Sequence, residues 1–344
     1  MPIMNDTEIG GRVRGRTMLV VEGFHERDVL FKSIFCGFPE LKISMDDVVV
    51  YETNIYSLVK DIDEEYGDDW DDTDIDIPFV YSKHKGLEGD ANILRKRDFT
   101  NIFLVFDYER QDTYFSEDSI ARMQEHFNDA ADNGKLFLNY PMVESYMEAD
   151  VNAKMDELHP YDESFRDRKV NVNECLGAEY KNRVKHKELK DMLKFGADIG
   201  GILVKHKLPE LPESCVERLL EQRNADESGI GTIIGEYFEG DARGACCHIA
   251  AKLKRLCPEG MSYRERLREI LRSLMYNNIC KASYVQNGVF DVAISDAAEV
   301  FLSLENGRIL EKQNECSRES SGFVHVLNTG VLIAADYNSK LIYI

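Results

Sequence analysis

Four acidic residues stand where the chain leaves short apolar segments, and their chemistry suggests a site. They are Glu22, Asp107, Glu109 and Glu144. Magnesium prefers oxygen ligands and usually takes only a few carboxylates, together with water and substrate phosphate. Two such ions can steady both the attacking and the leaving oxygen of a phosphoryl displacement. Converging carboxylates would repel one another strongly without a metal. The residue types therefore predict a divalent-metal site suited to phosphoryl transfer.

Each acid also has a plainer interpretation. Acidic residues at strand ends are often helix N-caps or first-turn residues, and any one of these four taken alone would more often be that than a ligand. The segment Asp107-Tyr108-Glu109 is weak evidence by itself. The combination, with every acid placed after a strand in the expected order, favours the metal site.

The apolar segments have the length and composition of buried strands. They lie at 18–23, 47–52, 101–109 and 135–140. Helical patterns lie between them, at 25–35, 54–67 and 116–134, the last with Ser116 as N-cap and Gly134 as terminator. This alternation predicts an α/β fold whose mostly parallel sheet carries helices on both faces. In such sheets ligand sites form at the carboxyl ends of the strands, where these acids would meet.

Beyond residue 150 the pattern becomes mainly helical. Helices are predicted at 174–195, 212–223, 243–256, 263–277 and 296–314, and strand-like runs at 323–328 and 330–337. The glycines at 229, 231 and 235 are interpreted as a loop, and those at 200 and 201 as a break. We expect a metal-binding catalytic domain at 1–150 and a mainly helical extension at 151–344 that docks substrate or a partner, with the boundary near 150–160.

The net charge of −21 is unevenly distributed. Residues 1–150 hold 15 basic and 33 acidic residues, a balance of −18, whereas residues 151–344 hold 27 and 30, a balance of −3. An acidic protein gains little nonspecific affinity for phosphate backbones, so any nucleic-acid contact must be local. The stretch 166–207, with 11 basic and 6 acidic residues, could grip substrate, dock onto an acidic partner, or simply be a solvated helix face.

Basic residues are scarce in the acidic half, and three of them are candidates for contacting substrate phosphate. They are Lys83, Lys85 and Arg110. The acidic run at 61–76 lacks the glycine and terminal Glu of an EF-hand, so a solvated loop is favoured over a calcium site.

Other sequence signals limit the possible classes. The eight cysteines form no C-x-x-C pair, which favours reduced thiols. No secretory signal and no apolar segment long enough to span a bilayer is present, so a soluble, cytoplasmic protein without membrane contact is expected. The chain has no G-x-x-x-x-G-K-[ST] motif and is not expected to hydrolyse nucleotide through a P-loop. Its oligomeric state is not predicted.

Three segments resemble the motifs of Toprim domains. M-L-V-V-E-G-F-H-E at 18–26 is similar to the opening motif, an apolar strand followed by Glu-Gly and a second acid. L-V-F-D-Y-E at 104–109 resembles the later D-x-D motif, with Glu in the second position. L-N-Y-P-M-V-E at 138–144 resembles the third acidic element of Toprim nucleases in the OLD-family and RloB-like groups of bacterial phage defence. The resemblance covers roughly residues 17–150.

This resemblance implies a nuclease that uses Mg²⁺ or Mn²⁺ to cleave DNA or RNA in antiviral defence. It implies that Glu22 and Glu26 are catalytic and that Asp107, Glu109 and Glu144 hold metal. Because the chain lacks a P-loop, an ATPase partner acting in trans is expected. Two rivals stay open: another Toprim phosphotransfer activity, such as a primase-like one, and a non-enzymatic regulatory or sensor subunit whose acidic edge is structural.

Overall fold

A six-stranded mixed sheet forms the centre of the protein. The computed structural model describes residues 16–149, 162–172, 177–184, 186–223, 226–320 and 322–342. The strands are β1 (Arg16–Val21), β2 (Val48–Val50), β3 (Phe99–Asp107), β4 (Asn128–Asp129), β5 (Gly134–Tyr140) and β8 (Leu327–Asn328). Their order is β2-β1-β3-β5-β4, and β8 also pairs with β5. β1, β2, β3 and β5 run parallel, while β4 and β8 are antiparallel to β5. The expected α/β class and the mostly parallel sheet are therefore confirmed.

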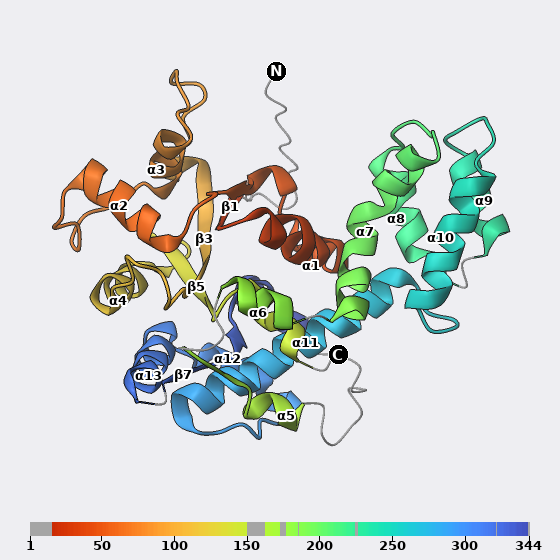
Figure 1. The fold of residues 1–344 in the computed structure, drawn as a ribbon. Helices are drawn as coiled ribbons and strands as arrows, with labels where there is room; N and C mark the ends of the chain where they lie inside the picture. The colour runs from red at the N-terminus through yellow and green to blue at the C-terminus, as the bar shows by residue number, and fades with distance from the viewer. Residues whose placement is uncertain are drawn as a thin grey trace.

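Helices lie on both faces of this sheet. The connection from β1 to β2 steps one way along the sheet, whereas those from β2 to β3 and from β3 to β5 step the other way. Because such crossovers are right-handed, their helices must fall on opposite faces. Accordingly, α1 (Lys32–Gly37) lies on one side, and α2 (Ile55–Tyr66) and α4 (Glu117–His126) lie on the other (Figure 1). β1 and the second half of β3 are consequently buried on both faces, which explains their unbroken apolar sequences.

Two details of this half differ from the sequence-based expectations. Ser116 does cap α4, accepting a hydrogen bond from the Ser119 N–H at 3.2 Å, but the helix ends at His126 rather than at Gly134. Gly134 has a φ of 117° and begins β5, where a Cβ would lie 3.0 Å from the Leu104 side chain. The helix α3 (Ile77–His84) was not predicted. Its N-cap, Asp76, is the last residue of the acidic run, which was expected from the sequence to be a solvated loop.

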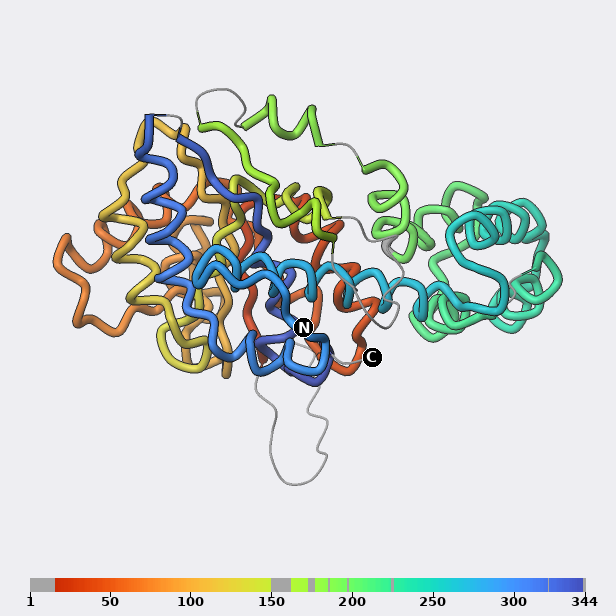
Figure 2. Tube along the Cα trace, turned by 90° about the horizontal axis from the view of Figure 1, so that it is seen from below, coloured from red at the N-terminus to blue at the C-terminus, as the bar shows by residue number. Residues whose placement is uncertain are grey.

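The second half of the chain is mainly helical, as expected. Its longer helices are α7 (Lys187–Lys205), α8 (Glu213–Glu221), α9 (Glu227–Gly235), α10 (Arg243–Leu256), α11 (Tyr263–Asn287) and α13 (Asn306–Arg318). α8, α9 and α10 form a lobe that projects to one side, and α11 runs from this lobe back into the body (Figure 2). Buried Arg264 holds the junction, since it donates to the Cys36 carbonyl at 3.0 Å and pairs with Glu217 and Glu221.

Several boundaries in this half were predicted wrongly. The helix expected at 174–195 is two helices, α6 (Ala178–Arg183) and α7, and α7 continues through both glycines at 200 and 201. The glycines at 229, 231 and 235 lie in α9, whose N-cap Asp226 accepts from the Gly229 N–H at 2.7 Å. The helix expected at 296–314 is interrupted at Ser303, between α12 (Ala297–Leu302) and α13.

The last apolar run also folds differently from the prediction. Residues 330–337 form the 3₁₀ turn η7 (Gly330–Leu332) and α14 (Ile333–Tyr337) instead of a strand. Nearly all of these side chains are buried, and a run buried on every side carries no periodicity to separate helix from strand. The expected domain boundary near 150–160 lies outside the described residues. Within the described part of the chain, every helix is too short or too polar to cross a bilayer.

Candidate active site at the acidic edge of the sheet

The parallel register brings the ends of β1 and β3 level with each other. Val21 is paired with Val105, and the Glu22 N–H donates to the Val105 carbonyl at 3.2 Å. The Glu22 side chain then turns across the sheet edge, where its Oε2 accepts a hydrogen bond from the Asp107 N–H at 3.0 Å. The first two predicted acids therefore meet directly at the carboxyl edge.

Asp107, the last residue of β3, lies at the centre of the cluster. It is buried, and the Asn139 side-chain amide lies 3.4 Å from its Oδ1. Burial raises the pKa of Asp107 well above its ordinary value, and the negative charges of four neighbours raise it further. Those neighbours are Glu22, Glu26, Glu144 and Glu109. All five acids assigned to the site from the sequence thus interact electrostatically with one another or with Asp107.

Two of these carboxyl groups hold their protons near neutral pH. Burial, reinforced by the charge of Glu109, raises the pKa of Glu22 to about 8. Burial and the charge of Glu144 raise the pKa of Glu26 to about 7. Glu26 begins the π-helical turn η1 (Glu26–Phe31), and a Cβ on Gly23 would lie 3.1 Å from its Oε2. Glycine at 23 therefore gives the Glu26 carboxylate room at this position.

Glu144 comes from the turn η5 (Val143–Glu148) that follows β5. Its side chain is buried, and its Oε2 has no hydrogen-bond partner among the described residues. Its Oε1 lies 3.8 Å from the Lys181 Nζ. A buried carboxylate oxygen without a donor is costly, and a cation or a donor from a bound molecule would relieve that cost.

Backbone strain is concentrated at the same edge. Four non-glycine residues in the described part of the chain have positive φ, and two of them, Glu52 (70°) and Glu109 (39°), follow β2 and β3 by two residues. The Glu52 N–H donates to the Glu22 carbonyl at 2.9 Å, so both strained residues flank the acidic cluster. Left-handed backbone in non-glycine residues occurs disproportionately at functional sites.

Lys181 was not assigned to the site from the sequence, which showed it only as part of a basic stretch. It lies on α6, and its side chain is 52% exposed. Burial would lower its pKa, but the charges of Glu144, Asp107 and other cluster acids outweigh burial and raise it. The structure therefore places one half-exposed cation against a group of acids that comes from another part of the chain, a relation that local sequence cannot reveal.

A buried amide network supports the cluster from behind and was also missed. The Asn139 Oδ1 accepts from the Gly330 N–H at 3.1 Å, and the Asn328 side chain donates to the Val143 carbonyl at 2.7 Å. The Asn278 Oδ1 accepts from the Asn328 N–H at 2.8 Å. Strand β8 and helix α11 thereby fix the end of β5 and the start of the turn that carries Glu144.

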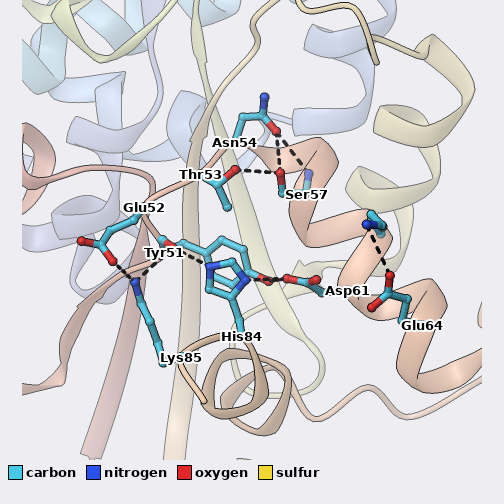
Figure 3. Close-up of polar contacts among 10 residues, drawn as sticks. Tyr51, Glu52, Thr53, Asn54, Ser57, Asp61, Glu64, His84 and Lys85 are labelled. Carbon is cyan, nitrogen blue, oxygen red and sulfur yellow. Dashed lines mark hydrogen bonds and ion pairs between the residues drawn. The ribbon is translucent and has the colours of Figure 1, made fainter. Parts of the chain in front are cut away.

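The three predicted phosphate contacts are already paired within the chain. Lys85 pairs with Glu52 and lies 3.3 Å from the Tyr51 carbonyl, beside a His84 ring that bridges Asp61 and Tyr51 (Figure 3). Lys83 lies 3.5 Å from Glu65. Arg110 lies 3.7 Å from Glu117 and donates to the Ser317 hydroxyl at 3.3 Å. Of the three, Lys85 pairs with Glu52, whose N–H donates to the Glu22 carbonyl.

The donor types fit a hard divalent cation, since the four acids around Asp107 all offer carboxylate oxygens. Even so, among the described residues no three His, Cys, Asp or Glu side chains are already arranged to hold a metal ion. Binding would therefore require carboxylates such as Glu144, with its unpaired oxygen, to turn toward a shared point.

Comparisons with protein-family models, curated proteins and solved structures found no match for this chain.

Proposed function

We propose that this protein is a nuclease that uses Mg²⁺ or Mn²⁺ to cleave phosphodiester bonds of DNA or RNA at its acidic edge. The observation that carries the proposal is the convergence of four glutamates on Asp107, with raised pKa values for Asp107, Glu22 and Glu26 and an unpaired Glu144 oxygen. Such a group is unfavourable without a compensating cation. Titratable groups with strongly perturbed pKa values concentrate at functional sites.

The residues divide into two groups by what each can do. Asp107, Glu109 and Glu144 would hold the metal, which when bound supplies positive charge to the transferring phosphoryl group. Glu22 has a pKa of about 8 and exchanges a proton near neutral pH, as a general acid or base must. The Asp107 N–H fixes one of its oxygens and so orients the carboxyl group. Glu26, with a pKa of about 7, is the second group suited to proton transfer.

The decisive experiment combines cleavage with metal binding. Purified protein is incubated with labelled DNA and RNA panels in Mg²⁺, Mn²⁺ or chelator, and manganese binding is measured by calorimetry. We expect cleavage only when metal is present. We also expect manganese binding to weaken as pH falls, because protons compete with the metal for the carboxylates of the acidic edge. A protein that awaits a trigger would still bind manganese, so absence of both cleavage and binding would refute the proposal.

One observation favours a second candidate, a non-enzymatic subunit. Lys181 already supplies a cation to the cluster, and no metal-binding group is preformed in the described residues. If Lys181 is a permanent counterion, Lys181→Met should lower the thermal midpoint by several degrees and metal should not restore it. If the site binds metal, saturating manganese should restore most of the loss.

The proposed biological setting rests on the motif resemblance alone. It is antiviral defence, with an ATPase acting in trans because the sequence contains no P-loop motif.

A further inference from the structure

Two aromatic side chains stand exposed on the loops of the acidic edge. Phe24 is 53% exposed and Tyr114 is 79% exposed. Among the described residues, the only other exposed large aromatic side chain is Tyr237, at 36%, in the projecting lobe. Single exposed apolar side chains are common on protein surfaces, but here two aromatic rings lie on loops of the same sheet edge as the acidic cluster.

Phe24 is held at the rim by its sequence neighbours. It lies between Glu22 and Glu26, whose side chains both belong to the cluster. Two residues span at most about 7 Å of chain, so the Phe24 backbone cannot be farther than that from Glu22. The exposed Phe24 ring therefore belongs to the loop that carries both acids, within a few residues of the cluster.

Tyr114 is held there by a hydrogen-bonded loop. The Asp112 N–H donates to the Glu109 carbonyl at 2.9 Å, and the Asp112 Oδ1 accepts from the Tyr114 N–H at 2.7 Å. The other oxygen of Asp112 accepts from the Asn54 amide at 2.7 Å, at the start of α2. The loop backbone is therefore tied to both strained loops of the edge, while the Tyr114 ring remains free.

We propose that Phe24 and Tyr114 stack on unpaired bases, so that the substrate is single-stranded or looped nucleic acid rather than continuous duplex. This inference rests on the proposed nuclease function. Stacking on an aromatic side chain contributes about 1–3 kcal/mol per base and tolerates any sequence. Bases inside a duplex already stack on their neighbours and cannot reach such rings without being unpaired.

The charge of the protein supports this substrate. With a balance of −18 over residues 1–150, the half that carries the site cannot rely on phosphate contacts for affinity. Single strands carry a lower charge density than duplex, and stacking supplies an attraction that does not depend on charge. Lysines do lie nearby: the pKa of His25, next to Phe24, is lowered to about 4 by burial and by Lys190, Lys181 and Lys194. These lysines would meet the backbone of a strand whose bases lie on the rings.

Binding of defined probes by the full chain tests this inference. Fluorescein-labelled oligo(dT), oligo(U) and a blunt-ended, fully paired duplex are titrated without metal, and anisotropy is recorded. We expect tighter binding of the single strands, and about a tenfold loss for Phe24→Ala or Tyr114→Ala. Phe24→Tyr and Tyr114→Phe keep a ring and should bind nearly as wild type does. The matched control is Leu302→Ala, since Leu302 is 73% exposed on α12 and not on a loop of the edge.

A second readout reports stacking directly. The only tryptophan, Trp70, is buried, so Tyr114→Trp introduces a single exposed indole whose emission should be quenched when oligo(dT) stacks on it. Equal affinity for the blunt-ended duplex and the single strands, or wild-type affinity in both alanine variants, would overturn the inference. Metal-dependent cutting of continuous duplex would overturn it while leaving the nuclease proposal intact.

Discussion

In Glu22 a backbone N–H fixes one carboxyl oxygen, while burial raises the pKa of the group to about 8. We expect Glu22→Gln to lower the cleavage rate about 10²-fold or more, because loss of a general acid or base commonly costs that much. The side-chain oxygen of the glutamine can still accept the hydrogen bond from the Asp107 N–H, so the fold should persist. Rates are measured with Mn²⁺ on labelled DNA and RNA, with Glu64→Gln, a change at an exposed ion pair of α2, as control. Wild-type cleavage by Glu22→Gln would show that the active-site assignment is wrong.

The raised pKa values predict how the stability of the metal-free protein depends on pH. Glu22 and Glu26 titrate at about 8 and about 7 in the folded protein, and near 4.5 when unfolded. Between these values the folded state binds more protons, so the free energy of unfolding must fall as pH rises from about 5 to about 8. Denaturant unfolding at several pH values measures the slope. Glu22→Gln should flatten it, and an equal slope in that variant would contradict the assigned pKa.

Asp107 and Glu144 should be needed for metal rather than for folding. Asp107→Ala and Glu144→Ala should each weaken manganese binding about tenfold or more, as loss of a ligand does. Their thermal midpoints should stay level or rise, because repulsion among the carboxylates is relieved. Calorimetry and thermal scans test both points, and unchanged binding in both variants would mark these acids as structural.

At the scale of elements, the sequence was most informative where local patterns repeat. The strands β1, β3 and β5 and the acids near their carboxyl ends could be predicted, because an apolar run with Glu or Asp at its end or a few residues beyond is visible locally. Helix α9 could not, since its glycines weigh against a helix that tertiary packing nevertheless stabilises. The roles of Lys181 and Asn328 depend on contacts across long stretches of sequence, which no local pattern encodes.

The amide network makes a prediction of its own at this scale. Asn328 donates to the Val143 carbonyl at 2.7 Å and accepts from the Val331 N–H at 3.0 Å, both in the buried interior. Asn328→Ala should therefore cost about 1–3 kcal/mol of unfolding free energy, because it leaves buried backbone groups without partners. Asn128→Ala, which removes a hydrogen bond at an exposed position, is the matched control. Similar denaturation midpoints for the two variants would show that the network is not stabilising.

At the scale of the whole molecule, the basic stretch 166–207 has two competing uses, gripping substrate or docking an ATPase. Of the lysines and arginines on α6, Lys181 and Arg183 face acids of their own chain, at 3.8 Å from Glu144 and 3.6 Å from Glu148. The α7 residues Lys190 and Lys194 instead lie close enough to His25 to lower its pKa. Lys190 and Lys194 are therefore the better residues to change in a test of substrate binding.

Changing Lys190 and Lys194 to Glu should weaken oligo(dT) binding. The slope of log affinity against log salt concentration should also become shallower, by about one unit for each phosphate that is no longer neutralised. Anisotropy titrations over a range of salt measure this, with Lys254→Glu, an exposed change on α10 in the projecting lobe, as control. Unchanged affinity and salt dependence would refute the substrate role and leave docking of a partner or a solvated helix face.

The pairing of β8 with β5 has a consequence for how the protein is made. The strand that leads to Glu144 is completed by residues 327–332, which the ribosome adds long after β1, β3 and β5 have emerged. A nascent chain can build the parallel strands early, but Asn139 and the turn after it lack their partners until that late segment arrives. The proposed cleavage activity should therefore appear only after residues 327–332 have left the ribosome, and not when β1, β3 and β5 alone have emerged.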